Sequence, residues 1–170
     1  MYTRHTFAPT SLGDITLVAS DGAIVGLYFP GHWYLPPRHA IGEAVTLADD
    51  PLLAEAATQL VEYLDGTRAS FDLPTAAHGT PLQEKVWAIL REIPFGETTT
   101  YGAIAAQLGD RTLAQAVGQA VGHNPLSIIV PCHRVVGSTG RLTGFAGGIE
   151  RKRALLDLEA PELAATARLF

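Results

Sequence analysis

The sequence predicts a mixed α/β (α+β) protein made of a small antiparallel sheet with one helix, followed by a mainly helical region. Short strand-like runs joined by a hairpin signal fill the beginning of the chain. Apolar residues recur at helical spacing from residue 51 onward, and a stretch at 74–81 rich in Ala, Gly, Thr and Pro interrupts them. We therefore expect one domain over residues 1–78 and a second over residues 79–170.

The composition is that of an ordinary globular chain. Hydrophobic residues make up 47% of the 170 positions and charged residues 17%, which suffices for a buried core. No apolar run approaches the roughly 20 residues of a membrane-spanning helix, and the first residues do not resemble a secretory signal. The single cysteine excludes an internal disulfide and a multi-thiolate zinc cluster. We expect a cytoplasmic protein with no membrane partner, metal or cofactor.

In the first part, residues 15–19 and 24–29 are strand-like and flank an Asp21-Gly22 hairpin signal. Residues 30–50 are rich in proline and glycine and predict a loosely packed loop. A helix should begin at Pro51, end before Gly66 and cover one face of the sheet. Residues 71–73 are a candidate for one more strand.

In the second part, Thr80 and Pro81 are a typical helix start, and residues 94–96 end that helix. Helices over 99–108 and 112–122, separated by a turn with Gly109, give the outline of a helix-turn-helix, although any pair of packed helices gives the same outline. The β-branched run 128–130 predicts a short buried strand that Pro131 ends. The last helix is expected over 149–158.

The only cysteine lies in the string Pro131-Cys132-His133-Arg134-Val135. A thiol becomes nucleophilic as the thiolate, which needs a nearby base or positive charge, and His133 and Arg134 follow at once. Most single cysteines are nevertheless buried packing residues, so the spacing alone leaves both readings open. Glu159 ends the last helix, where the helix dipole disfavours a carboxylate, and this suggests a partner such as a protonatable histidine.

The whole string, with Asn124-Pro125 before it and Gly147-Gly148 and Glu159 after it, resembles the O6-alkylguanine-DNA alkyltransferases, or methylated-DNA–protein-cysteine methyltransferases. The similarity is strong over 79–160 and weak over 7–74. It implies a ribonuclease-H-like first domain and a second domain that binds DNA. The implied activity is stoichiometric DNA repair, in which the alkyl group of O6-alkylguanine, and also of O4-alkylthymine, moves irreversibly to Cys132.

The resemblance also assigns residue roles. Cys132, His133 and Glu159 form the nucleophile, base and orienting group, and Asn124 braces the turn of the nucleophile. Tyr101 donates to the departing guanine or crowds its phosphate, and the backbone of Val135 and Ser138 reads the base. The remaining candidates for substrate or DNA contact are Arg111, Ala114, Gln115, Gly118, Arg134 and Phe145.

Two of these positions depart from the family pattern. Gln115 stands in Ala114-Gln115-Ala116-Val117-Gly118 where the family usually has an arginine that enters the gap left by the flipped base. Arg111 is near enough in sequence to replace it in part. Phe145 stands where the family often has tyrosine, so a stacking wall is kept while a hydroxyl is lost.

The resemblance implies double-stranded DNA as the partner, bound through the minor groove by a monomer, with side-by-side binding of several copies left open. Residues 85–153 hold eight basic and four acidic side chains, against three and ten in 1–84, within a chain of net charge −5. Two other functions remain as alternatives. One is a module that binds alkylated DNA without transferring the group; the other is a cysteine hydrolase that uses Cys132, His133 and Glu159.

Overall fold

The computed structural model describes residues 2–161, which form two compact units. Unit 1 comprises the residues up to 77 together with 125–129, and unit 2 comprises 78–124 and the residues from 130 onward. Each unit is described by itself. Within the described range, no helix is both long enough and apolar enough to cross a membrane.

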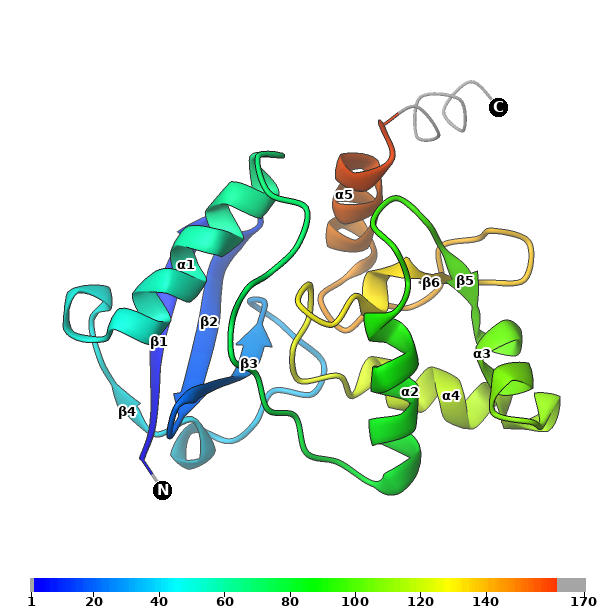
Figure 1. Ribbon diagram of the computed structural model, residues 1–170, viewed down its shortest axis with the longest axis horizontal. Helices are drawn as coiled ribbons and strands as arrows, with labels where there is room; N and C mark the ends of the chain where they lie inside the picture. Colours follow the sequence, from blue (N-terminus) through cyan, green and yellow to red (C-terminus); the bar gives the residue numbers. More distant parts are fainter. Residues whose placement is uncertain (1, 162–170) are drawn as a thin grey trace. The chain divides into compact units, whose positions relative to one another are not determined.

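Unit 1 is built around a four-stranded sheet with the strand order β3-β2-β1-β4 (Figure 1). Its strands are β1 (Thr3–Thr10), β2 (Gly13–Ser20), β3 (Ala23–Tyr28) and β4 (Glu43–Ala44). The first three run antiparallel in sequence order, and β4 runs parallel to β1. The predicted hairpin is confirmed, and Asp21 takes the positive φ of 54° that a tight turn requires and that Asp tolerates.

Helix α1 (Pro51–Leu64) packs on this sheet, as the spacing of its apolar residues predicts (Figure 1). Leu53 and Leu60 are completely or almost completely buried, each contributing about 1.5–3 kcal/mol through the hydrophobic effect. Asp50 caps the helix by accepting a hydrogen bond from the Leu53 backbone N–H at 3.0 Å. The same carboxylate forms a buried ion pair with Arg4 of β1, so the cap also ties the helix to the sheet.

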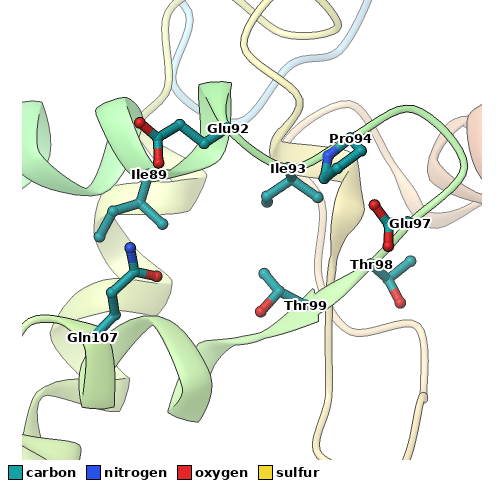
Figure 2. Close-up of a pocket in the computed structure, with 8 residues that line it drawn as sticks. All are labelled: Ile89, Glu92, Ile93, Pro94, Glu97, Thr98, Thr99 and Gln107. Atoms are coloured by element: carbon teal, nitrogen blue, oxygen red, sulfur yellow. The ribbon is translucent and has the colours of Figure 1, made fainter.

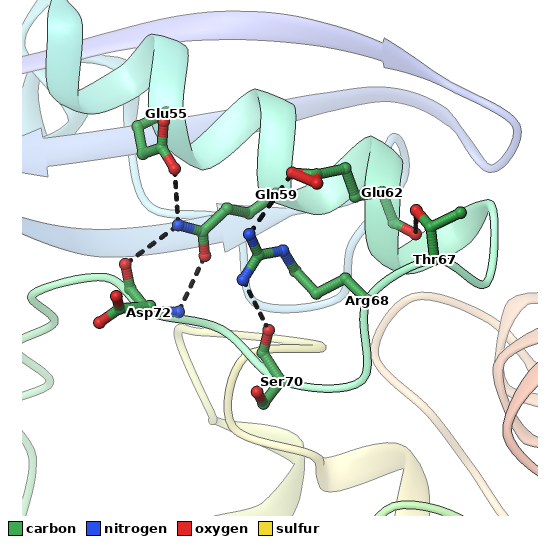
Figure 3. Close-up of polar contacts among 7 residues, drawn as sticks. All are labelled: Glu55, Gln59, Glu62, Thr67, Arg68, Ser70 and Asp72. Atoms are coloured by element: carbon green, nitrogen blue, oxygen red, sulfur yellow. Dashed lines mark hydrogen bonds and ion pairs between the residues drawn. The ribbon is translucent and has the colours of Figure 1, made fainter.

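The segment after α1 is held by side chains rather than by a strand ladder (Figure 3). The Gln59 amide accepts from the Asp72 N–H at 2.8 Å and donates to the Asp72 carbonyl at 3.0 Å. This pairing satisfies the backbone groups that a neighbouring strand would otherwise have to satisfy. The strand predicted at 71–73 is therefore wrong, and only Thr75 makes an isolated bridge, to Ile24.

Residues 30–50 form a loop with short 3₁₀ turns, η1 (Arg38–Ile41) and η2 (Leu47–Asp49), and the edge strand β4. His32 is buried and stacks on Phe29, with ring centroids 6.1 Å apart, whereas Trp33 and Tyr34 are exposed. Packing in the core of unit 1 therefore accounts for His32, whereas Trp33 and Tyr34 lie at the surface.

Unit 2 is mainly helical. Its elements are α2 (Pro81–Arg91), β5 (Thr99–Thr100), α3 (Tyr101–Gln107), η3 (Arg111–Leu113), α4 (Ala114–Gly122), η4 (Cys132–Arg134), β6 (Val135–Val136) and α5 (Ile149–Glu159). Thr80 and Gln83 form a capping box at the start of α2. Trp87 of α2 donates from Nε1 to the Ala120 carbonyl at 2.8 Å and so joins α2 to α4. The order α3, turn, η3, α4 follows the predicted outline, with Gly109 in the turn at a φ of 95°.

The strand predicted at 128–130 is wrong. Ile128 has a φ of 73°, which no strand residue adopts, and the Ile129 N–H donates back to the Ser127 carbonyl at 2.9 Å in a tight turn. The extended residues lie just after the cysteine instead, where β6 pairs in parallel with β5. Cys132 therefore begins a 3₁₀ turn that leads into a strand.

Candidate active site

Backbone hydrogen bonds on both sides fix the position of Cys132. Its own N–H donates to the Val130 carbonyl at 2.8 Å, and the Arg134 N–H donates to the Pro131 carbonyl at 3.0 Å. Asn124, which follows α4, donates from Nδ2 to the same Val130 carbonyl at 2.8 Å. The cysteine is 4% exposed and Asn124 is 2% exposed. The thiol is thus held in a rigid, nearly dry turn, and an amide from another element anchors that turn.

His133 is fully buried, and its Nε2 lies 2.8 Å from Oε2 of Glu159, at the end of α5. A carboxylate can only accept, so Nε2 carries the proton and Nδ1 carries the lone pair. Nδ1 has no hydrogen-bond partner among residues 2–161. The partner that the helix-end position of Glu159 requires is therefore this histidine, in the tautomer whose free nitrogen can act as a base.

Arg134 makes the second contact to Glu159. Its Nε donates to Oε1 at 2.7 Å and its Nη2 donates to Oε2 at 2.8 Å, the two-pronged geometry that binds carboxylates most strongly. Nη1 donates to the Ile93 carbonyl at 2.6 Å. Arg134, expected to contact substrate or DNA, is instead buried, and its guanidinium is directed toward these inner partners.

The protonation states follow from these contacts. Burial, reinforced by the positive charges of Arg134 and Lys152, keeps the pKa of His133 well below its usual value, so the imidazole is neutral near pH 7. Burial raises the pKa of Glu159 to about 8, although a backbone hydrogen bond from Gly96 lowers it. The bidentate contact from Arg134 opposes that shift, and because a guanidinium 2.7 Å away stabilises the anion directly, we take Glu159 as ionised.

Lys152 is a charged residue of this cluster that the sequence analysis missed. It lies on α5, is 1% exposed, and donates from Nζ to the Val135 carbonyl at 2.6 Å and the Thr143 carbonyl at 3.3 Å. Burial lowers the pKa of Lys152 to about 8, while a Cys132 thiolate raises it, so the two groups interact. The signal was present in the sequence: Lys152, Leu155 and Glu159 share one buried face of α5.

Tyr101 begins α3 and lies within electrostatic reach of Cys132, whose thiolate raises the pKa of Tyr101 after burial has already raised it. Its ring lies beside Gly118 of α4, where an added Cβ would approach ring carbon Cδ1 at 3.7 Å. Its hydroxyl accepts a hydrogen bond from Thr143 at 2.9 Å. Phe145, in the same loop as Thr143, is buried.

The remaining predicted residues lie nearer the solvent. Arg111 is exposed in η3. In the first turn of α4, Ala114 is partly exposed and Gln115 is exposed. Ser138 is exposed in the turn after β6, while Val135 is buried in β6. Arg111 thus precedes the helix rather than lying on it, as its sequence position indicated.

A pocket of about 260 Å³ opens between the end of α2, β5 and the end of α3 (Figure 2). It is lined by Ile89, Glu92, Ile93, Pro94, Glu97, Thr98, Thr99 and Gln107. None of the predicted site residues lines it, and its rim carries two carboxylates, which repel a nucleic acid. We therefore do not place the reaction there.

Comparison with known proteins matches both parts of the chain to one family. Residues 81–161 match the DNA-binding domain of 6-O-methylguanine DNA methyltransferase, and residues 3–77 match its ribonuclease-like domain. A methylated-DNA–protein-cysteine methyltransferase of Mycobacterium bovis is 43% identical over 159 residues, which cover 94% of this chain and 93% of the relative. The constitutive one of Bacillus subtilis is 40% identical over 156 residues, with coverages of 91% and 94%.

Solved structures give the same result. The O6-methylguanine methyltransferase of Mycobacterium tuberculosis superposes with a TM-score of 0.82 at 40% identity, covering 99% of both chains. The structure of OGT from that organism in complex with DNA superposes with a TM-score of 0.79 at 41% identity, covering 95% of this chain and 94% of that one. The mixed α/β fold class is confirmed, and the chain belongs to the methylated-DNA–protein-cysteine methyltransferase family.

Proposed function

We propose that this protein repairs alkylated DNA directly, by moving the alkyl group of O6-alkylguanine, and of O4-alkylthymine, onto Cys132. The observation that carries this proposal is the hydrogen bond from His133 to Glu159 beside the only cysteine of the chain. It supports a neutral histidine whose Nδ1 can remove the thiol proton, directly or through a water.

The step balances without a cofactor. The thiolate sulfur attacks the alkyl carbon, an S–C bond forms, and the C–O6 bond breaks with its electron pair left on guanine. A proton from Tyr101 then neutralises the departing base. The product is a thioether, which water does not hydrolyse under mild conditions, so each molecule reacts once.

Three features of the cluster favour the thiolate. Asn124 fixes the turn that carries Cys132, Arg134 holds Glu159 in place and ionised, and Lys152 adds a positive charge that no carboxylate in residues 2–161 pairs with. We reassign Arg134 from DNA contact to the support of Glu159, because its donors are directed inward.

We place DNA on the side of unit 2 that carries α4, with the helix in the minor groove and a single copy of the protein per lesion. Ala114 and Gly118 have small side chains that let a helix backbone approach a narrow groove, and Gln115 is exposed between them. Because the buried thiol cannot reach a stacked base, the nucleotide must leave the duplex at a cost of a few kcal/mol. The reaction needs a reduced thiol, which suits the cytoplasm.

Intact-protein mass after incubation with a duplex containing O6-methylguanine tests the proposal. We expect the mass to increase by one methylene, once per molecule, and the Cys132→Ser variant to bind the duplex without any increase because an alcohol is a far weaker nucleophile. Binding without a mass gain in the unmodified protein would indicate a lesion-binding module instead. Multiple turnovers of a chromogenic thioester would indicate a hydrolase.

A further inference from the structure

Thr143 is held by three separate contacts. Its hydroxyl donates to Tyr101 Oη at 2.9 Å, and its carbonyl accepts from Lys152 Nζ at 3.3 Å. Its methyl group lies against Gly137, where an added Cβ would come within 3.3 Å of it. The Lys152 ammonium also binds the Val135 carbonyl of β6 at 2.6 Å. A loop residue thus has its backbone, methyl group and hydroxyl all fixed relative to the strand that follows the cysteine.

The direction of the hydrogen bond determines where the Tyr101 proton points. A phenol oxygen carries one proton and accepts through its lone pairs. Because Thr143 donates to that oxygen, the O–H of Tyr101 cannot donate back to it and must point elsewhere. The ring itself is placed by the start of α3 and by Gly118 of α4. The remaining freedom of Tyr101, rotation of its hydroxyl, is the one that Thr143 restricts.

We propose that Thr143 is a positioning residue that aims the proton of Tyr101 at the departing base, with Lys152 holding Thr143 in place through its carbonyl. This inference rests on the proposed function, because it assigns Thr143 to the proton transfer that completes the alkyl transfer. Thr143 itself gives up no proton. The proton moves from Tyr101 Oη to the base, and solvent restores it.

The electrostatics of Tyr101 fit this role. Burial raises the pKa of Tyr101, the hydrogen bond from Thr143 lowers it, and a Cys132 thiolate raises it again. The thiolate therefore keeps the phenol protonated before the reaction. Once the sulfur becomes a neutral thioether, that contribution disappears and Tyr101 becomes a better acid, at the moment when the leaving base needs a proton.

A pair of substitutions separates the hydroxyl from the methyl group. Thr143→Val keeps the shape and loses the donor, and Thr143→Ser keeps the donor and loses the methyl group. We expect the Val variant to transfer about fivefold more slowly to a duplex substrate, as the loss of one hydrogen bond implies, with Ser close to the original protein. Thr58→Val, at an exposed position of α1, is the matched control and should leave the rate unchanged.

The decisive readout is the coupling to Tyr101. In a Tyr101→Phe background, Thr143→Val should cause no further loss, because its effect passes through the phenol. A second readout needs no transfer: NMR titration of ¹³Cζ-labelled tyrosine, assigned with Tyr101→Phe, should show a higher pKa for Tyr101 in the Val variant. The inference is overturned if Thr143→Val leaves the Tyr101 titration unchanged, or if it slows Tyr101→Phe as much as it slows the original protein. Failure of the unmodified protein to gain mass would overturn the proposed function alone, since the titration would still report on Thr143.

Discussion

The two units bury charged side chains in contrasting ways. In unit 1, Arg4 meets Asp50, which also caps α1. The hydrogen bond from Arg4 lowers the pKa of Asp50, so the partner outweighs burial there. In unit 2, Arg134 meets Glu159 in the same two-pronged manner, yet burial raises the pKa of Glu159 and a second cation, Lys152, lies in the same cluster.

The difference lies in the charge that remains. The ion pair of unit 1 is neutral, so its burial serves the attachment of a helix to a sheet. The cluster of unit 2 holds two cations, Arg134 and Lys152, and one carboxylate, Glu159. Arg134 pairs with that carboxylate, whereas Lys152 donates to two carbonyl oxygens. One positive charge is therefore left near Cys132, and a thiolate is the group that balances it. A buried charge cluster that is not neutral by itself thus marks the reactive unit.

Glu159→Gln should have the largest effect, because it leaves Arg134 buried without its anion and replaces two acceptor oxygens, which bind Arg134 and His133, by a single amide oxygen and an NH₂ donor. We expect the free energy of unfolding of unit 2 to fall by about 3 kcal/mol and alkyl transfer to slow strongly. Urea unfolding followed by Trp87 fluorescence in a Trp33→Phe background measures the stability. Asp50→Asn is the matched control in unit 1: it should also destabilise the protein, yet leave the rate with free O6-benzylguanine within about twofold. Equal losses of rate in both variants would mean that stability alone explains the effect.

The two units should also respond differently to acid. The pKa of His133 is depressed in the folded protein, so unfolding favours its protonation, and the stability contributed by neutral His133 is lost as the pH falls below the unfolded value of 6.5. The pKa of Asp50 is lowered from 3.8, so its contribution persists until the pH approaches that value. As the pH is lowered from 7 to 4, the urea concentration at the midpoint of unfolding should therefore decrease for unit 2 before it decreases for unit 1. A simultaneous fall, or an earlier one for unit 1, would contradict this assignment of His133.

Lys152→Met removes the surplus charge while keeping a long apolar side chain. Because Lys152 and a Cys132 thiolate attract each other, its loss should slow the reaction of Cys132 with iodoacetamide at pH 7 about tenfold, the effect of roughly 1.4 kcal/mol on the thiolate. Lys85→Met, at an exposed position of α2, is the control and should react as the original protein does. An unchanged rate in Lys152→Met would show that Lys152 holds the two carbonyls without activating the thiol.

Local rules predicted those parts of the fold that local interactions determine. The helices from Pro51 and Pro81 follow from their caps and apolar spacing, and the hairpin follows from Asp21-Gly22. Strand β1 was not predicted because its burial pattern is the reverse of the usual one. The polar residues Arg4 and Thr6 are buried, while the apolar Phe7 is 58% exposed. The turn at Ile128 escaped as well, since a positive φ at a β-branched residue is imposed by its surroundings rather than by its own preference.

The residues of the site likewise fall into those that the sequence predicted and those that it did not. Cys132 and His133 stand in a continuous motif, and the helix dipole showed that Glu159 needed a partner, so these three could be found from the sequence. Lys152 and Thr143 act through backbone carbonyls and a hydroxyl brought together by the loop after β6. Helical spacing does place Lys152 on one face of α5 with Leu155 and Glu159. No local pattern records the contacts that Lys152 and Thr143 make, because either residue type is ordinary in a basic helix or a glycine-rich loop.

The surface of unit 2 offers the smallest but most selective prediction. Gln115 is exposed in α4, where the family usually has an arginine. Gln115→Arg should strengthen duplex binding and speed repair of duplex DNA a few-fold, since arginine adds a planar group to fill the gap and a cation that releases counterions. The salt dependence should steepen by about one unit of slope. Gln119→Arg, exposed one turn further along α4, adds the same charge and should reproduce the steeper slope without the faster repair.

The reaction with free O6-benzylguanine should hardly change in Gln115→Arg, because no base has to be extruded and the buried cluster around Cys132 is untouched. Pseudo-first-order rates on the duplex and on the free base, measured side by side, separate the two steps. Equal duplex rates for Gln115→Arg and the original protein would mean that another cation, with Arg111 of η3 the nearest in sequence, already fills the gap, or that extrusion does not limit the rate. Arg111→Gln in the original background then distinguishes these outcomes: a loss of duplex rate that Gln115→Arg restores assigns the gap to Arg111, and no loss means that extrusion does not limit the rate.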